Sequence, residues 1–131
     1  MNWLDWYDGL MKPAWTPEPS TIALIWGLLY PVILLSFGFV FVQGFRGVLP
    51  RWVLLPFALN LTANLLFMPL FGGLRSVPLA TADILIVWGT LVWCGAAIWP
   101  YARWVALVQV PYFAWVSTAT VLQLSIAWMN W

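Results

Sequence analysis

The chain has 131 residues, of which 64% are hydrophobic and only 7% are charged, with a net charge of +1. A water-soluble domain carries roughly 25% charged residues, so this composition excludes an ordinary soluble domain. Histidine is absent, which removes the usual general base near neutral pH and the commonest metal and haem ligand. The net charge is near zero and no basic stripe is present, so a nucleic-acid partner is not expected. We predict an integral membrane protein without a metal site, whose main partner is the lipid bilayer.

Residues 1–20 form the most patterned stretch, in which Trp and Tyr alternate with prolines and acids. They lack the basic start of a secretory signal and contain Asp5, Asp8 and Glu18. Prolines at positions 13, 17 and 19 exclude a long helix. We expect residues 1–20 to lie on the membrane surface as an amphipathic lid over one end of the protein. A plain interfacial anchor is the alternative.

Four apolar runs follow, and each is long enough to cross a bilayer as a helix, which takes about 20 residues. They cover residues 21–42, 52–71, 77–99 and 104–129. Helices are expected because a segment in hydrocarbon must satisfy its own backbone groups, and the runs lack the alternation of a membrane β-barrel. The predicted fold is all-α: one multi-pass bundle of four transmembrane helices over residues 21–131. Prolines at positions 56, 69 and 111 are expected to kink or start their helices.

The breaks between the runs carry most of the basic residues. Arg46, Arg51 and Arg103 fall in the breaks on one side of the membrane, whereas Lys12 and Arg75 fall on the other. By a margin of one arginine, the positive-inside rule favours a cytoplasmic location for the first group.

Twelve tryptophans are more than membrane anchoring requires. Several lie at the ends of the runs, where indole rings favour the membrane interface. Others lie deeper, and because a buried indole N–H wants an acceptor, these rings either pack against other helices or line a cavity. The deeper tryptophans are Trp26, Trp88, Trp93 and Trp115.

Among the polar residues inside the apolar runs, two asparagines and one acid are candidates for a role in function. Asn60 and Asn64 are four residues apart and share a helix face. Amides are costly in hydrocarbon unless paired, so these two either join helices or orient a ligand in a pocket. Asp83 lies about two turns into the third run, where an acid is a candidate proton relay or ligand partner. Hydrogen bonding of Asp83 to a neighbouring helix end or to headgroup water is equally compatible with the sequence.

Three blocks, spaced along nearly the whole chain, carry a family resemblance. They are WYDGLMKPAWTP at residues 6–17 with Trp26 after it, NLLFMPLFGG at residues 64–73, and PYFAW at residues 111–115 followed by Ala119 and Leu122. In these blocks the chain resembles the translocator protein (TspO/MBR) family, also called tryptophan-rich sensory proteins or peripheral-type benzodiazepine receptors.

The resemblance implies a pocket enclosed by the helices and capped by the lid, in a receptor- or sensor-like protein. Its ligands would be porphyrins or similar flat hydrophobic molecules, and a free-base porphyrin suits a chain without histidine better than haem. Tyr7 and Trp26 would line the lid and first-helix side, Asn64 would supply a polar contact, and Trp115 the opposing aromatic wall. Some bacterial relatives promote light-dependent porphyrin breakdown, in which Trp26 and Trp115 would be the catalytic residues. Porphyrin would be the ligand, with no other cofactor, and a homodimer is expected.

The chain also departs from the family pattern. Family members have five transmembrane helices, whereas four are predicted here, so either the family's first helix is missing from this protein or this chain starts late. Leu122-Gln123 stands where the family has Leu-Asn, and the sterol-recognition pattern of animal members is not visible. Two other functions therefore stay open: a proton-coupled exporter that uses Asp83, and a structural membrane subunit in which the tryptophans only pack.

Overall fold

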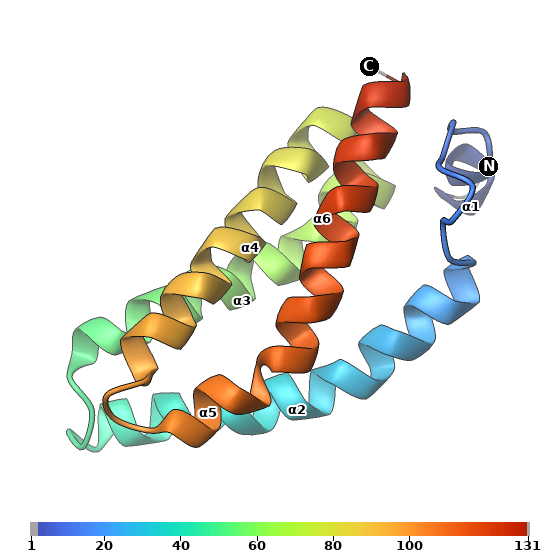
Figure 1. The fold of residues 1–131 in the computed structure, drawn as a ribbon. Helices are drawn as coiled ribbons and strands as arrows, with labels where there is room; N and C mark the ends of the chain where they lie inside the picture. Colours follow the sequence, from blue (N-terminus) through green and yellow to red (C-terminus); the bar gives the residue numbers. More distant parts are fainter. Residues whose placement is uncertain (1–2, 131) are drawn as a thin grey trace.

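The computed structural model describes residues 3–130, which form helices joined by short turns, without a strand. Among these residues, four helical segments are long and apolar enough to cross a membrane (Figure 1). They are α2 (Pro19–Phe45), the segment Arg51–Gly73, α4 (Val77–Ile98) and α6 (Val110–Asn130). The all-α bundle of four membrane-spanning helices predicted from the apolar runs is confirmed.

Helix α2 is longer than a membrane crossing requires. Pro19 lies in its first turn, where a missing N–H costs no hydrogen bond, and the helix continues for 27 residues, past Pro31, to Phe45. At 1.5 Å per residue it is about 40 Å long, compared with a hydrocarbon core of about 30 Å. The prediction of residues 21–42 therefore missed about one turn. Figure 1 shows α2 diverging from α4 and α6 toward its N-terminal end.

The second spanning segment consists of three helical pieces in succession. A 3-10 turn, η1 (Arg51–Val53), leads into α3 (Leu54–Met68), which ends in a wider π-helical turn, η2 (Pro69–Gly73). Pro69 has no N–H, so the regular hydrogen-bond ladder cannot continue through it. The turn closes instead with the N–H of Leu74 donating to the carbonyl of Pro69 at 2.8 Å.

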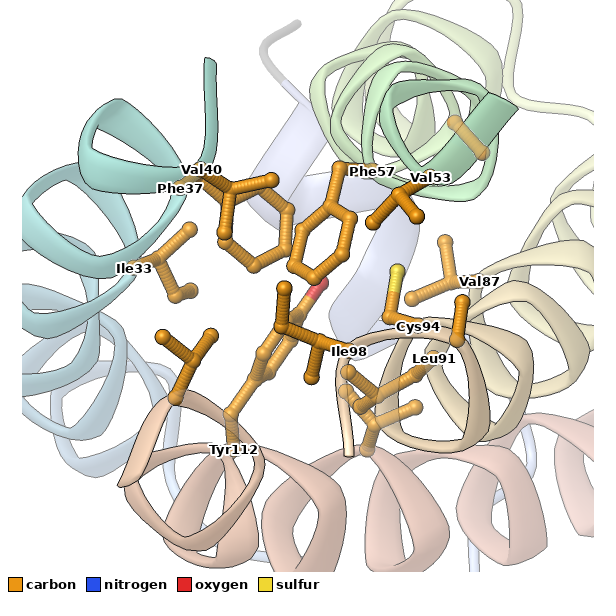
Figure 2. Packing of buried hydrophobic residues seen from close by; sticks show 14 of the residues in the cluster. Ile33, Phe37, Val40, Val53, Phe57, Val87, Leu91, Cys94, Ile98 and Tyr112 are labelled. Carbon is orange, nitrogen blue, oxygen red and sulfur yellow. The ribbon is translucent and has the colours of Figure 1, made fainter. Parts of the chain in front are cut away.

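Helix α4 begins where the sequence predicted. The hydroxyl of Ser76 accepts a hydrogen bond from the N–H of Leu79 at 3.2 Å, which caps the first turn. The helix packs against both α3 and α6. Figure 2 shows the core that it shares with α2, α3 and α6, in which Phe37 and Phe57 meet edge to face with ring centroids 4.8 Å apart.

The last predicted run, residues 104–129, is two helices rather than one. A short helix, α5 (Arg103–Val108), is separated from α6 by a break at Gln109. The cause is Pro111, which cannot donate a backbone hydrogen bond and whose ring clashes with the preceding turn. The buried Gln109 side chain stabilises the break by donating from Nε2 to the hydroxyl of Ser36, in α2, at 2.7 Å. Figure 1 shows α5 running alongside α2 before the chain turns into α6.

The two ends of the bundle differ in their composition. We call one end the cap end: it holds α1 (Trp3–Asp8), residues 9–18, the turn at residues 74–76 and the end of α6. We call the other the arginine end: it holds the turns at residues 46–50 and 99–102. These two turns lie together in Figure 1.

The cap end is covered by the segment that the sequence predicted to be a lid, of which residues 1 and 2 lie outside the described residues. The rings of Trp6 and Tyr7 pack edge-on against Phe71, with centroids 5.1 and 5.8 Å apart. Asn130 at the end of α6 joins the lid as well, because its Oδ1 accepts the N–H of Met11 at 2.9 Å and its Nδ2 donates to the Met11 carbonyl at 2.7 Å. The lid is thus held by η2 on one side and by α6 on the other.

Candidate functional site

A cavity of about 340 Å³ lies between α2, η2, α3, α4 and α6, beneath α1. This volume falls within the range of about 300–1,000 Å³ typical of small-molecule sites. Most of the lining is apolar: Pro19, Ile22, Ala23, Phe67, Met68, Phe71, Ile84, Val87, Ala119, Leu122 and Ile126. The rest is aromatic or polar: Tyr7, Trp26, Tyr30, Asn64, Trp115 and Gln123.

The four residues predicted from the sequence as ligand contacts all lie in this lining. Tyr7 comes from α1, Trp26 from α2, Asn64 from α3 and Trp115 from α6. These elements span most of the chain, so the fold brings the three family-like sequence blocks to one cavity. Whether the four residues bind a ligand there stays a prediction.

Aromatic rings form one wall of the cavity. Trp26 stacks on Tyr30, one turn further along α2, with ring centroids 5.4 Å apart and an interplanar angle of 28°. Trp115 meets Trp26 from α6 at 6.4 Å and 81°, an edge-to-face contact. Tyr112 meets Trp26 in the same way at 6.2 Å. The wall therefore joins α2 to α6 across the part of the bundle where the two helices diverge.

A chain of hydrogen bonds leads from this wall into the core. The hydroxyl of Tyr30 donates to Asn64 Oδ1 at 2.9 Å, and Asn64 Nδ2 donates to the hydroxyl of Tyr112 at 2.8 Å. That hydroxyl in turn donates to Asn60 Oδ1 at 2.9 Å, and Asn60 Nδ2 donates to the carbonyl of Val87 at 2.9 Å. The chain connects α2, α3, α6 and α4.

The sequence left two roles open for the asparagine pair, which were hydrogen bonding between helices and contact with a ligand. The structure separates Asn60 from Asn64 in this respect. Asn60 is fully buried and does not line the cavity, so its role is to join helices. Asn64 joins helices and also lines the cavity.

Two polar lining residues were not predicted as site residues. Tyr30 follows Trp26 by one helical turn, and that spacing was the available signal. Gln123, where the family pattern has Asn, donates from Nε2 to the hydroxyl of Thr81 at 3.1 Å and to the carbonyl of Val77 at 3.4 Å. Its place in the lining depends on how α6 is rotated against α4, which the sequence does not specify.

One polar atom of the aromatic wall is buried without a partner. Trp115 Nε1 is shielded from solvent, and no described residue accepts a hydrogen bond from it. An unpaired buried donor costs about 1–3 kcal/mol relative to a paired one. A ligand with an acceptor at this position would recover that cost.

The lining carries no charged side chain within the described residues. Lys12 lies at the lid, where its Nζ donates to the carbonyls of Tyr7 and Leu10 at 2.7 and 3.1 Å and lies 4.5 Å from the centroid of the Tyr7 ring. Burial raises the pKa of the Tyr7 hydroxyl, and the neighbouring Asp8 raises it further. Tyr7 therefore presents a neutral ring and hydroxyl to the cavity.

Asp83 is not part of this site. It is 6% exposed in α4, and no described residue donates to its Oδ2, but it does not line the cavity. No group of three or more His, Cys, Asp or Glu that could hold a metal ion occurs within residues 3–130.

Comparison with known proteins agrees with the sequence blocks. A model of the TspO/MBR family matches residues 1–129. A "Tryptophan-rich sensory protein" of Cereibacter sphaeroides is 30% identical over 130 residues, which cover 97% of this chain and 78% of the relative. "Tryptophan-rich protein TspO" of Bacillus cereus is 33% identical over 129 residues, with 95% and 80% covered. The human "Translocator protein" is 30% identical over 122 residues, with 91% and 71% covered.

The fold and these similarities agree over nearly the whole length of the chain. The four apolar helices make it an integral, multi-pass membrane protein. The cavity is lined by residues of each of the blocks that carry the resemblance. The chain belongs to the TspO/MBR family.

Proposed function

We propose that this protein binds a porphyrin or a similar flat, hydrophobic molecule in the cavity and acts as a receptor- or sensor-like membrane protein. The observation that carries the proposal is the pair of indole rings, Trp26 and Trp115, which meet at 6.4 Å from different helices on the same cavity. Flat macrocycles offer large apolar faces, and indole rings bind such faces by stacking. Relatives named as sensory and translocator proteins are consistent with a ligand-handling role.

The polarity of the lining supports a ligand without a metal. The lining is uncharged, and Asn64 and Tyr30 supply a small number of polar contacts that would orient a guest. The chain has no histidine to coordinate haem iron, and Cys94 is buried outside the lining. A free-base porphyrin therefore fits better than haem.

The proposal extends to a light-dependent activity. An excited porphyrin and oxygen held beside electron-rich indoles would react there, and we assign Trp26 and Trp115 the catalytic role in breakdown of the bound porphyrin. The support is their shared contact and their place in the lining.

The test is a titration of the detergent-solubilised protein with protoporphyrin IX, followed by tryptophan quenching in dim light. Trp26→Phe and Trp115→Phe should each weaken binding about 2- to 10-fold, since an aromatic contact contributes about 0.5–1.5 kcal/mol. Trp93→Phe is the matched control, because Trp93 is 40% exposed on α4 and does not line the cavity. The proposal fails if binding is not saturable, or if Trp93→Phe weakens it as much as the cavity variants do.

The light-dependent activity needs a second measurement. The porphyrin absorbance band should decay under illumination in the presence of oxygen, and the decay should require both Trp26 and Trp115. If the Trp26→Phe and Trp115→Phe variants degrade the porphyrin as fast as the unaltered protein does, at matched occupancy, the function is limited to binding. The expected homodimer stays a prediction, which the mass of the detergent-solubilised protein by light scattering will test.

A further inference from the structure

The charges of the protein are separated between its two ends. Arg46, Arg51 and Arg103 all lie at the arginine end. Three of the four acids lie within residues 1–18, at the cap end. The fourth, Asp83, precedes the end of α4 at Ile98 by 15 residues, or about 22 Å of helix. This distance is far too long for an ion pair between Asp83 and any of the three arginines, and none of the acids among the described residues lies at the arginine end.

The backbone segments that carry the three arginines are held in place by packing contacts. Arg46 is the C-cap of α2, and Arg51 begins η1 after a turn that is anchored by the buried Leu49. Arg103 begins α5, which is held against α2 by the edge-to-face contact of Trp104 with Phe39, at 4.8 Å between centroids. Figure 1 shows the two turns at the same end of the bundle.

Backbone N–H groups in the turn at the arginine end already donate to carbonyls of the chain. Binding of an anion there would therefore depend on the side chains. In the turn after α2, the N–H of Val48 and that of Leu49 both donate to the carbonyl of Gln43, at 2.9 and 3.2 Å. The three arginines are exposed, and the guanidinium of Arg103 lies 5.2 Å from the centroid of the Trp99 ring. Stacking of this kind leaves the N–H edge of a guanidinium open to an anion.

Exposed aromatic rings mark the level of this end in the membrane. Trp and Tyr favour the headgroup region, where one edge is apolar and the other is hydrated. The exposed rings at this end are Phe45, Trp52, Trp99, Tyr101 and Trp104. The arginines among them therefore lie at the depth of lipid phosphates.

We propose that the arginine end is a docking surface for the headgroups of acidic phospholipids. A guanidinium binds a phosphate through two parallel N–H···O bonds, which a lysine cannot match. Acidic headgroups are favoured over zwitterionic ones because the latter carry a cation of their own, which the uncompensated arginines repel. The protein would thus hold a ring of acidic lipid at one end and not at the other.

The test measures lipids retained by the full chain. The protein is placed in nanodiscs of equal parts phosphatidylglycerol and phosphatidylcholine, and the lipids that stay bound are counted by native mass spectrometry. The unaltered protein should retain phosphatidylglycerol preferentially. Changing Arg46, Arg51 and Arg103 together to Gln should lower this preference by about fivefold for each arginine that contacts a headgroup.

Matched variants decide what the loss means. The triple change to Lys keeps the charge and should retain part of the preference, and Arg75→Gln, at the cap end, should leave it intact. Size-exclusion elution and helical circular dichroism verify that each variant is folded. The proposal is overturned if the triple Gln variant retains as much phosphatidylglycerol, if Arg75→Gln loses as much, or if inorganic phosphate displaces the lipid and so identifies a free-phosphate site.

Discussion

At the scale of single residues, Asn60 and Asn64 show how similar positions diverge in role. Both lie on one face of α3, one helical turn apart, and both belong to the hydrogen-bond chain that starts at Tyr30. Only Asn64 of the pair lines the cavity, whereas Asn60 donates to the carbonyl of Val87 and to the hydroxyl of Thr90. Stability and ligand binding should therefore respond differently to changes at these two positions.

Asn60→Leu should lower the free energy of unfolding by about 1–3 kcal/mol, because it leaves the buried hydroxyl of Tyr112 without an acceptor. Porphyrin affinity should stay unchanged, since Asn60 does not reach the cavity. Asn64→Leu should lower both quantities. Thermal unfolding in detergent and the quenching titration measure the two effects, and a loss of affinity in a folded Asn60→Leu protein would contradict this division.

Asp83→Asn separates the binding proposal from the exporter. Because Asp83 lies outside the lining, the change should leave protoporphyrin affinity unchanged. A proton-coupled exporter would instead lose substrate transport, which a pH gradient across proteoliposomes makes measurable. Abolished transport with unaltered porphyrin binding would favour the exporter.

At the scale of elements, α2 approaches the start of α3 closely at one point. A Cβ added at Gly44 would overlap the side chain of Leu54, whereas a Cβ added at Gly38, in the same helix, meets nothing within 4 Å. We expect Gly44→Ala to lower the free energy of unfolding by about 1–3 kcal/mol, the usual cost of overpacking, and Gly38→Ala to be neutral. Thermal unfolding of the two variants is the measurement, and equal midpoints would show that Leu54 moves aside without cost.

The elements were largely predictable from the sequence, and the exception depends on a contact between distant parts of the chain. The length of the apolar runs predicted the four membrane-spanning helices, because a segment in hydrocarbon must satisfy its own backbone hydrogen bonds and a helix does so. Pro111 was recognised as a kink, yet the independent direction of α5 depends on Gln109 meeting Ser36 of α2, a contact between residues 73 positions apart. The residues predicted as ligand contacts lie in the cavity lining where sequence blocks resemble a family, and their binding role stays a prediction. Tyr30 and Gln123 were missed because their place depends on how each helix is rotated and tilted.

At the scale of the whole molecule, the bundle is closely packed at one half and hollow at the other. Among the core residues labelled in Figure 2, Phe57 and Ile98 lie close to the arginine end of α3 and α4 and are fully buried. A smaller cluster, which includes Tyr7, Phe71 and Ile126, closes the cap end. The cavity lies between the two clusters, so the lid residues and the main core both determine its shape.

The length of α2 makes the bilayer itself a determinant of this cavity. A helix about 40 Å long in a hydrocarbon core of about 30 Å relieves the mismatch by tilting, while helices of 21–23 residues fit nearly upright. A thicker bilayer would draw α2 more upright, toward α6, and narrow the space between them. Protoporphyrin affinity in nanodiscs should therefore fall as the acyl chains lengthen. Membrane thickness would then regulate ligand affinity in this protein.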